Sequence, residues 1–296
     1  MLKQKYFLAD IFILSAEKQP IKLSWRKIEW LHNASKYVAE AIESVLKQSF
    51  EDWELIIVDD GSTDNTVDII RSYTDSRIRL ICNEHDFIGS LNLGLKESSG
   101  KYIARMDADD IMHPDRLKIQ YNIMEEEPEI TVCGSWVKIF SEKRPPILPV
   151  LLNGRLDNIY LYLLKQNPLY HPTIMMRGDF LRMYNILYEN YKYAEDYKLW
   201  FEIAKLGGVF FIESQPLLYY RMTENQVSKL YMNEKRETAL RIRNEVLQFL
   251  MEKNEDNIWI HLLREGLELA EKEGTLASEE VYDIWRLVFS KIIINH

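Results

Sequence analysis

Glycine, cysteine and long apolar runs are scarce in this chain, and each scarcity excludes a class of protein or site. Only 11 of the 296 residues are glycine, and neither GxGxxG nor GxxxxGK[ST] occurs, which excludes the two common glycine-rich phosphate loops. Cys82 and Cys133 lie far apart, so a cysteine zinc site is excluded and both are expected to be buried thiols of a reducing compartment. No run reaches the roughly 18 apolar residues of a membrane-spanning helix.

Basic residues are also too few for a nucleic-acid-binding surface. Lysine and arginine number 37 against 46 aspartates and glutamates, which gives a net charge of −9. This balance lacks a basic footprint, so we expect no nucleic-acid partner. An acidic protein that handles an anionic ligand needs a local cation, and a divalent metal is the usual one. The chain is long enough for one large domain, or for one domain with an appendage.

Strand-like and helix-like patterns alternate from residue 36 to about 140. This alternation predicts an α/β fold with a mostly parallel central sheet and helices on both faces. The proline-rich stretch 141–154 is expected to be a loop, and the pattern is helical from about residue 228 to the end. The predicted strands are 54–58, 78–82, 102–106, 130–140, 173–177, 209–213 and 217–221, and the predicted helices are 38–48, 67–73, 91–97, 115–126, 156–164 and 196–205.

Acidic residues follow two of the predicted strands. Asp59 and Asp60 come after the run ELIIV, and Asp107, Asp109 and Asp110 come after YIARM. Ligands gather at the carboxyl ends of strands in an open α/β sheet, so these clusters are expected to converge. Converging carboxylates repel one another unless a cation lies between them, and Mg²⁺ or Mn²⁺ suits oxygen ligands. The alternative is that an aspartate after a strand only caps the next helix.

Four motifs in a fixed order carry a resemblance to a known family. They are VDDGS (58–62), MDADD (106–110), PDRL (114–117) and AEDYKLW (194–200). Over roughly residues 33–228 the chain resembles a family 2 glycosyltransferase of the GT-A fold. The resemblance implies three parts: an atypical N-terminal segment (1–32), a GT-A nucleotide-sugar transferase domain (33–228) and a C-terminal helical subdomain (229–296).

The resemblance also implies a reaction and its partners. An inverting, hexosyltransferase-type enzyme would move a sugar from a nucleotide-sugar donor, with UDP-sugars in first place, to a saccharide or lipid-linked acceptor in cell-surface polysaccharide synthesis. We expect such an enzyme in the cytoplasm, with peripheral association at the inner face of the membrane as an option. The alternatives are a nucleotidyltransferase, and a catalytically impaired relative that acts as a binding or scaffold subunit.

By the same resemblance, individual acids receive roles at the donor and the metal. Asp60 would contact the nucleoside with Asp59 beside it, and Asp107 and Asp109 would form the DxD motif. Asp109 would ligate Mn²⁺ or Mg²⁺, and Asp107 would contact the ribose or the metal. A metal bound there would stabilise the charge that grows on the departing nucleoside diphosphate.

The resemblance places the catalytic base in the AEDYKLW motif. Asp196 in first place, or Glu195, would act as the base by taking the proton of the acceptor hydroxyl. Their alternative reading is a charged helix start, where acidic side chains favour the helix dipole. Arg221 is predicted to neutralise donor phosphate, with a solvated strand end as its alternative, and Arg116 is predicted to start a helix.

Two departures from the family pattern lie near the ends of the predicted domain. The family opens with an apolar strand ending in Pro-x-Tyr-Asn; here only Asn33, a predicted donor-binding residue, matches. His32 replaces the aromatic residue, and Glu29 stands inside the strand, where an unpaired buried carboxylate is costly. We therefore hypothesise that the first strand is displaced, rebuilt or lost and that nucleoside binding is weakened. Thr223 stands near the position where many relatives carry a histidine, which in some of them joins the metal site, so a third protein ligand there is not expected.

Overall fold

The computed structural model describes residues 9–15, 28–31, 34–141, 144–149, 152–222 and 231–293. Within 9–15 and 28–31 it describes the backbone alone. Asn33 and Thr223 lie outside the described residues, as do both predicted domain boundaries. The division of the chain into three parts therefore stays a prediction.

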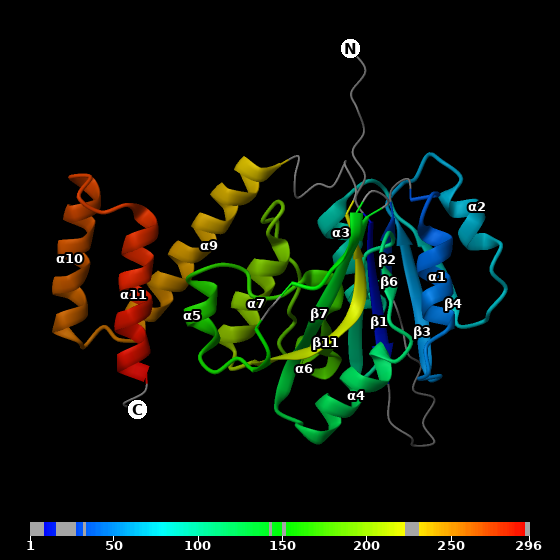
Figure 1. Cartoon of the computed structure of the whole chain (residues 1–296), viewed down its shortest axis with the longest axis horizontal. Coiled ribbons are helices and arrows are strands. Elements are labelled where there is room, and N and C mark those ends of the chain that lie inside the picture. Colours follow the sequence, from blue (N-terminus) through cyan, green and yellow to red (C-terminus); the bar gives the residue numbers. More distant parts are fainter. Residues whose placement is uncertain are drawn as a thin grey trace, which may run out of the picture.

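Strands and helices alternate through the first two thirds of the chain, and three helices follow (Figure 1). The strands are β1 (Ala9–Ser15), β2 (Ile28–Leu31), β3 (Trp53–Asp59), β4 (Ile78–Cys82), β5 (Tyr102–Met106), β6 (Ile111–Met112), β7 (Ile130–Ser141), β8 (Arg144–Ile147), β9 (Gly154–Arg155), β10 (Met175–Arg177) and β11 (Val209–Arg221). The helices are α1 (Val38–Leu46), α2 (Thr66–Arg71), α3 (Phe87–Glu97), α4 (Arg116–Glu126), α5 (Ile159–Leu163), the 3₁₀ turn η1 (His171–Thr173), α6 (Gly178–Met183), α7 (Glu195–Lys205), α9 (Met232–Glu252), α10 (Ile258–Lys272) and α11 (Ser278–Ile293).

One sheet runs through the molecule in the order β4-β3-β2-β1-β5-β10-β7-β11-β6. Strands β2, β3, β4, β5, β7 and β11 all point in one direction, because each reversed strand between them pairs antiparallel on both sides. The reversed strands β1 and β10 lie between these parallel strands. The α/β class is confirmed, and the predicted parallel set is present, but antiparallel insertions make the sheet mixed.

The first strand of the domain is present in the sheet, which answers part of the hypothesis about it. Strand β2 pairs parallel with β3, with Glu29 opposite Ile57 and Leu31 opposite Asp59. Strand β1 lies antiparallel between β2 and β5, with Ile11 opposite Met106. The strand is therefore neither lost nor displaced from β3, and the N-terminal part of the sheet is rebuilt by an added strand.

Helices cover both faces of the central strands. Every residue of β5 is buried, as are six of the seven residues of β3. Successive strand residues point to opposite faces, so burial of both sets requires a layer on each side. Helix α3 packs on β2 and β3, α4 packs on β7 and β11, and α6 packs on β5 and β10. The apolar strands thus form a core that holds their carboxyl ends in fixed positions.

Three sequence predictions need correction. Residues 209–213 and 217–221 form one strand, β11, whose register against β7 shifts around Pro216 because proline lacks the N–H of a regular ladder. The 141–154 stretch is not all loop, since β8 pairs with β7 and β9 with β11. Cys82 is exposed rather than buried, because it ends the edge strand β4, whereas Cys133 is buried as predicted.

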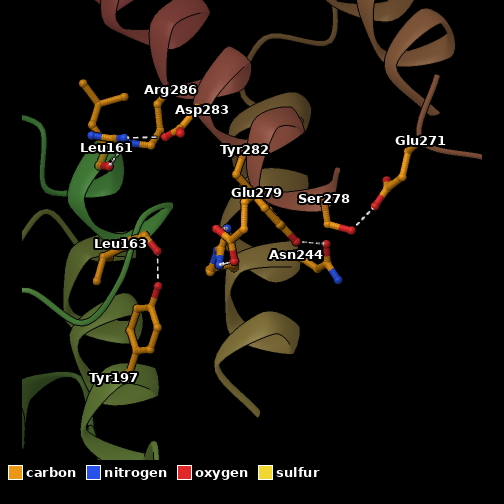
Figure 2. A network of polar contacts seen from close by, with 11 residues as sticks. Leu161, Leu163, Tyr197, Asn244, Glu271, Ser278, Glu279, Tyr282, Asp283 and Arg286 are labelled. Carbon is orange, nitrogen blue, oxygen red and sulfur yellow. Dashed lines mark hydrogen bonds and ion pairs between the residues drawn. The ribbon is translucent and has the colours of Figure 1, made fainter. Parts of the chain in front are cut away.

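Polar contacts link the C-terminal helices to α5 and to one another (Figure 2). Arg286 of α11 donates its Nε–H to the Leu161 carbonyl of α5 at 3.0 Å. Arg243 of α9 forms a two-pronged ion pair with Glu279 of α11, at 2.8 and 2.7 Å. Helix α9 also packs against α5 and α7. None of the helices within the described ranges combines the length and the apolarity that a bilayer crossing requires.

Arg116 is a fully buried cation that ties α4 to the central strands. Burial lowers the pKa of its guanidinium to about 9. Its four hydrogen bonds go to the carbonyls of Pro172 (2.8 Å), Arg105 (2.7 Å) and Ile174 (3.1 Å) and to the Gln120 side chain (2.9 Å). The predicted helix start is confirmed, and the side chain also satisfies backbone carbonyls between strands.

Replacing Arg116 with methionine leaves those buried carbonyls without donors. We expect Arg116→Met to lower the free energy of unfolding by about 3 kcal/mol or more, measured by urea denaturation. The control is Arg155→Met, which removes an exposed ion pair with Glu129 and should cost less than about 1 kcal/mol. Equal denaturation midpoints for the two variants would contradict this role of Arg116.

Candidate active site at the carboxyl edge of the sheet

The strand register brings the two predicted acidic clusters to the same edge of the sheet. Asp59 lies opposite Leu31, which lies opposite Ala9, and Ile11 lies opposite Met106. The chain two residues beyond Met106 is therefore level with Asp59. Three strand spacings separate β3 from β5, a distance of about 14 Å. The clusters share one edge, but they stand at two different places along it.

The Asp59–Asp60 cluster is built into a tight turn after β3. The Asp60 carboxylate is fully buried; it accepts hydrogen bonds from the Asp86 N–H at 2.8 Å and the Ser90 hydroxyl at 2.6 Å. The His85 Nδ1 lies 2.8 Å from its other oxygen. Gly61 follows in the left-handed region, at φ 78°, which glycine adopts without strain. Asp60 thereby fixes the start of α3 against the end of β3.

The second cluster gathers three carboxylates within reach of one ion. Asp107, Asp109 and Asp110 each offer one oxygen, and these oxygens lie within 4.8 Å of one another. Asp107 forms an ion pair with Arg105 at 2.5 Å, and Asp110 accepts a hydrogen bond from the Arg221 N–H at 2.7 Å. The other Asp110 oxygen is buried without a hydrogen-bond partner. Such an arrangement offers oxygen ligands that a cation would satisfy.

The carboxyl groups of this cluster hold their protons tightly. Burial raises the pKa of Asp109 to about 7, helped by repulsion from Asp107, and burial raises the pKa of Asp107 to about 6. Burial also raises the pKa of Asp110, with repulsion from Asp109 added. Acids this close ionise together only when a positive charge compensates them. The residues therefore fit a hard divalent cation such as Mn²⁺ or Mg²⁺.

Arg105 carries a positive charge that acts on this cluster and on the predicted base. Its side chain is 2% exposed, on β5 directly before the DxD motif. Burial raises the pKa of Asp107, Asp109, Glu195 and Asp196, and the positive charge of Arg105 opposes that rise in each of them. Glu195 stands 86 positions after Asp109 in the sequence.

Glu195 and Asp196 are the first two residues of α7, and their environments differ. Asp196 accepts hydrogen bonds from the Asn167 side chain at 2.6 Å and from the Tyr197 N–H at 2.7 Å, which orient its carboxylate. One Glu195 oxygen is buried without a hydrogen-bond partner. Burial, and then repulsion from Asp196, raises the pKa of Glu195 to about 8, and burial also raises the pKa of Asp196. Burial thus favours the protonated form of Glu195.

Arg221 holds the loop that carries the DxD motif. Its Nε–H donates to the Asp109 carbonyl at 2.6 Å, and its guanidinium pairs with Glu40. The rings of Tyr37 and Phe140 lie 4.5 and 4.6 Å from its central carbon. Arg221 is buried at the end of β11, so the alternative of a solvated strand end is wrong. Its predicted contact with donor phosphate stays a prediction.

Two features of the site were not predicted from the sequence: Arg105, and a histidine–tyrosine pair. Asp110 is predicted in the acidic cluster, but without a role at the metal. The His171 Nε2 lies 2.8 Å from the Tyr188 hydroxyl, and Asn92 of α3 bonds both the N–H and the carbonyl of Tyr188. Arginine in the apolar run YIARM, next to three aspartates, was the available signal for Arg105. A buried cation requires partners, and those aspartates supply them.

Solved structures resemble this fold. The S. aureus protein TarS in complex with UDP-GlcNAc matches with a TM-score of 0.60 and 21% identity, over 74% of this chain and 65% of that one. The mannosyltransferase PcManGT from Pyrobaculum calidifontis, in complex with GDP-Man and Mn²⁺, matches with a TM-score of 0.52 and 14% identity, over 88% and 84%. The fold and its acidic edge define a protein of the GT-A class.

Sequence comparisons identify the family. Residues 31–187 match the family described as Glycosyl transferase family 2. A protein of Haemophilus influenzae named "Uncharacterized glycosyltransferase" is 36% identical over 239 residues, which cover 75% of this chain and 72% of that one. A bifunctional glycosyltransferase of Dictyostelium discoideum is 28% identical over 230 residues, 64% of this chain and 30% of that one. This chain belongs to the family 2 glycosyltransferases.

The raised pKa values of Asp107 and Asp109 predict how stability depends on pH. The usual pKa is 3.8, and the folded protein raises that of Asp109 to about 7. The folded state therefore binds this proton more tightly than the unfolded state does. The resulting contribution to the free energy of unfolding is present below about pH 4 and is lost as the pH rises through 7. In metal-free buffer we expect the Tm to fall between pH 5 and pH 8, and Asp109→Asn to flatten that fall.

Asp157→Asn is the control for this experiment, because the Asp157 side chain is 92% exposed. This variant should follow the wild-type slope. The same slope for Asp109→Asn would contradict the assignment of the raised pKa to the DxD cluster.

Proposed function

We propose that this chain transfers a sugar, with inversion, from a nucleotide-sugar donor to a hydroxyl of a saccharide or lipid-linked acceptor. The observation that supports it most is the cluster of Asp107, Asp109 and Asp110 at the carboxyl edge of the sheet, whose oxygens lie within 4.8 Å of one another. The TarS complex with UDP-GlcNAc favours a UDP-sugar as the donor. The PcManGT complex with GDP-Man and Mn²⁺ favours a divalent metal.

The donor would lie along the carboxyl edge of the sheet. Its nucleoside would contact Asp60 and Asp59, with Asn33 nearby, and its diphosphate would reach the DxD cluster. The separation of about 14 Å between β3 and β5 leaves room for an extended nucleoside diphosphate. Asp60 is held by the Asp86 N–H and the Ser90 hydroxyl, so this end of the site is formed before the donor binds.

The metal would be held by Asp109 and Asp107, with Asp110 adjoining. A bound Mn²⁺ or Mg²⁺ supplies positive charge against the diphosphate that leaves in the transition state. Arg105 holds Asp107 in place from the protein side, and Arg221 holds the Asp109 carbonyl. These contacts fix the cluster before any ligand arrives, which reduces the cost of reorganisation during the reaction.

The acceptor would be activated by Asp196. Its carboxylate is oriented by Asn167 and the Tyr197 N–H, and it would take the proton of the attacking hydroxyl. Burial favours the protonated form of Glu195, whose pKa is raised to about 8, so it can donate a hydrogen bond to the acceptor. An attack from the side opposite the diphosphate inverts the anomeric carbon and requires no second carboxylate as a nucleophile.

The second candidate is a catalytically impaired relative that acts as a binding or scaffold subunit. It is kept because β1 is inserted between β2 and β5, next to the strands that carry the predicted nucleoside and metal contacts. Titration calorimetry with UDP and Mn²⁺ separates the two candidates at the donor pocket. Micromolar binding is expected for a working pocket and would refute the hypothesis of weakened nucleoside binding. Absence of UDP binding, together with no hydrolysis of any nucleotide-sugar, would support the impaired relative.

Two variants should separate donor binding from catalysis. Asp109→Ala removes a metal ligand, and we expect it to abolish metal-dependent binding of the donor. Asp196→Ala should leave donor affinity within a few-fold of wild type and lower turnover by about 100-fold or more. A screen of nucleotide-sugars for metal-dependent release of nucleoside diphosphate identifies the donor, and calorimetry then gives its affinity for each variant.

Asp157→Ala serves as the matched control, since it removes an exposed carboxylate. It should change neither donor affinity nor turnover. Equal loss of donor affinity in Asp109→Ala and Asp196→Ala would overturn this division of roles.

A further inference from the structure

The first turn of α9 lies against the segment that leads into the predicted base. The rings of Tyr231 and Tyr193 are stacked, with centroids 4.4 Å apart and an interplanar angle of 9°. Tyr231 directly precedes α9, and Tyr193 stands two residues before Glu195. Tyr193 has a φ of 65°, which is costly for a side chain of this size and persists only where the surroundings impose it. The stack therefore fixes the start of α9 beside Glu195.

Lys235 lies in the first turn of α9, on the face that continues from Tyr231. It follows Tyr231 by four residues, so the two side chains share a helix face, and its N–H bonds the Tyr231 carbonyl at 2.9 Å. The same face continues through Ala239 to Ile242 and Val246, which pack into the core. Lys235 itself is exposed, one turn beyond the point where this packing ends.

The orientation of α9 relative to α7 is fixed by charged contacts. Lys198 of α7 and Tyr191 both reach Glu245 of α9, at 2.7 and 2.6 Å. The positive charge of Lys235 opposes the burial that raises the pKa of Glu195 and of Asp196, and it adds to the burial that lowers the pKa of His171. Lys235 stands one helical turn after Tyr231, whose ring is stacked on Tyr193 two residues before Glu195.

This position suits the acceptor rather than the donor. In an inverting transfer the base stands with the acceptor, opposite the departing diphosphate. The chain carries a net charge of −9, and Asp196 is itself acidic, so an anionic acceptor would be repelled unless a local cation offset this field. Arg105 is buried against Asp107, whereas Lys235 is exposed and accessible to a ligand.

We propose that Tyr193, Tyr231 and Lys235 line the acceptor subsite, and that Lys235 selects a sugar bearing a carboxylate or phosphate next to the reacting hydroxyl. This inference rests on the proposed function for the assignment of the acceptor side. The tyrosine pair supplies an aromatic surface on which a sugar ring can pack. Lys235 supplies a charge-assisted hydrogen bond to the anionic group.

Three small sugars test the proposal by binding alone. NMR titrations with methyl glucoside, methyl glucuronide and glucose 6-phosphate, in the presence of UDP and Mg²⁺, give the affinity of a neutral, a carboxylate and a phosphate probe. We expect wild type to bind at least one anionic sugar about tenfold more tightly than the neutral one. Lys235→Glu should remove that preference, and the comparison of the two anionic probes shows which anion is selected.

Arg236→Glu is the matched control, because it makes the same change of charge one residue further along α9, on the side that faces Glu279 of α11. It should keep the wild-type preference. Three results would overturn the proposal. They are equal affinities of wild type for the three sugars, no binding of any of them, and a preference for an anionic sugar that survives Lys235→Glu. A rival role, in which Lys235 only tunes the base, predicts equal effects on neutral and anionic sugars.

A second measurement distinguishes failure of the proposed function from failure of the anion site. Metal-dependent hydrolysis of nucleotide-sugars by wild type is measured on the same samples. No hydrolysis together with an anionic preference that requires Lys235 would contradict the transferase and keep the anion site. Hydrolysis without that preference would contradict the anion site and keep the transferase.

Discussion

The buried guanidinium of Arg105 forms an ion pair with Asp107 at 2.5 Å, where β5 ends and the DxD loop begins. Its positive charge also opposes the burial that raises the pKa of Glu195 and of Asp196. A buried cation of this kind is costly unless its partners are fixed around it. Here the sheet fixes the partner, because β5 carries Arg105 two residues before Asp107.

Around this interaction the chain separates two tasks along the edge of the sheet. The end of β3 holds Asp60 in a rigid turn against α3, about three strand spacings from the DxD cluster. Helix α3 then reaches the other side of the site, because Asn92 bonds both backbone groups of Tyr188, whose hydroxyl meets His171. These hydrogen bonds link α3 to the segment between α6 and α7 and to η1.

Much of this architecture could be predicted from the sequence, because short apolar runs in α/β proteins usually form buried strands. The strands 78–82 and 102–106 have the bounds predicted from the sequence. The acids after β3 and β5 share one edge of the sheet, but the two clusters do not converge as expected, because β2 and β1 lie between those strands. The family resemblance predicts that Glu195 and Asp196 carry the base, which composition alone cannot do. Their position relative to the DxD cluster depends on the tertiary packing of α7, which local sequence patterns do not indicate.

Other features depended on long-range pairing and were missed. The antiparallel insertion of β1 follows from which strands are adjacent in space, and nothing in residues 9–15 specifies that neighbour. The single strand β11 was read as two because Pro216 interrupts its pattern, yet parallel pairing with β7 carries the strand through. From the sequence, Asp110 can equally be a helix cap after a strand. Only the folded structure shows that one of its oxygens accepts a hydrogen bond from the Arg221 N–H, while the other is buried without a hydrogen-bond partner.

The most direct test of the account is to locate the metal. Anomalous diffraction at the manganese absorption edge, from crystals grown with Mn²⁺ and UDP, places the ion without reference to activity. The account predicts one ion at direct ligand distance, about 2.2 Å, from a carboxylate oxygen of Asp109, with the Asp196 carboxylate facing the same cavity. An ion bound elsewhere, or Asp196 turned away from the nucleotide, would contradict it.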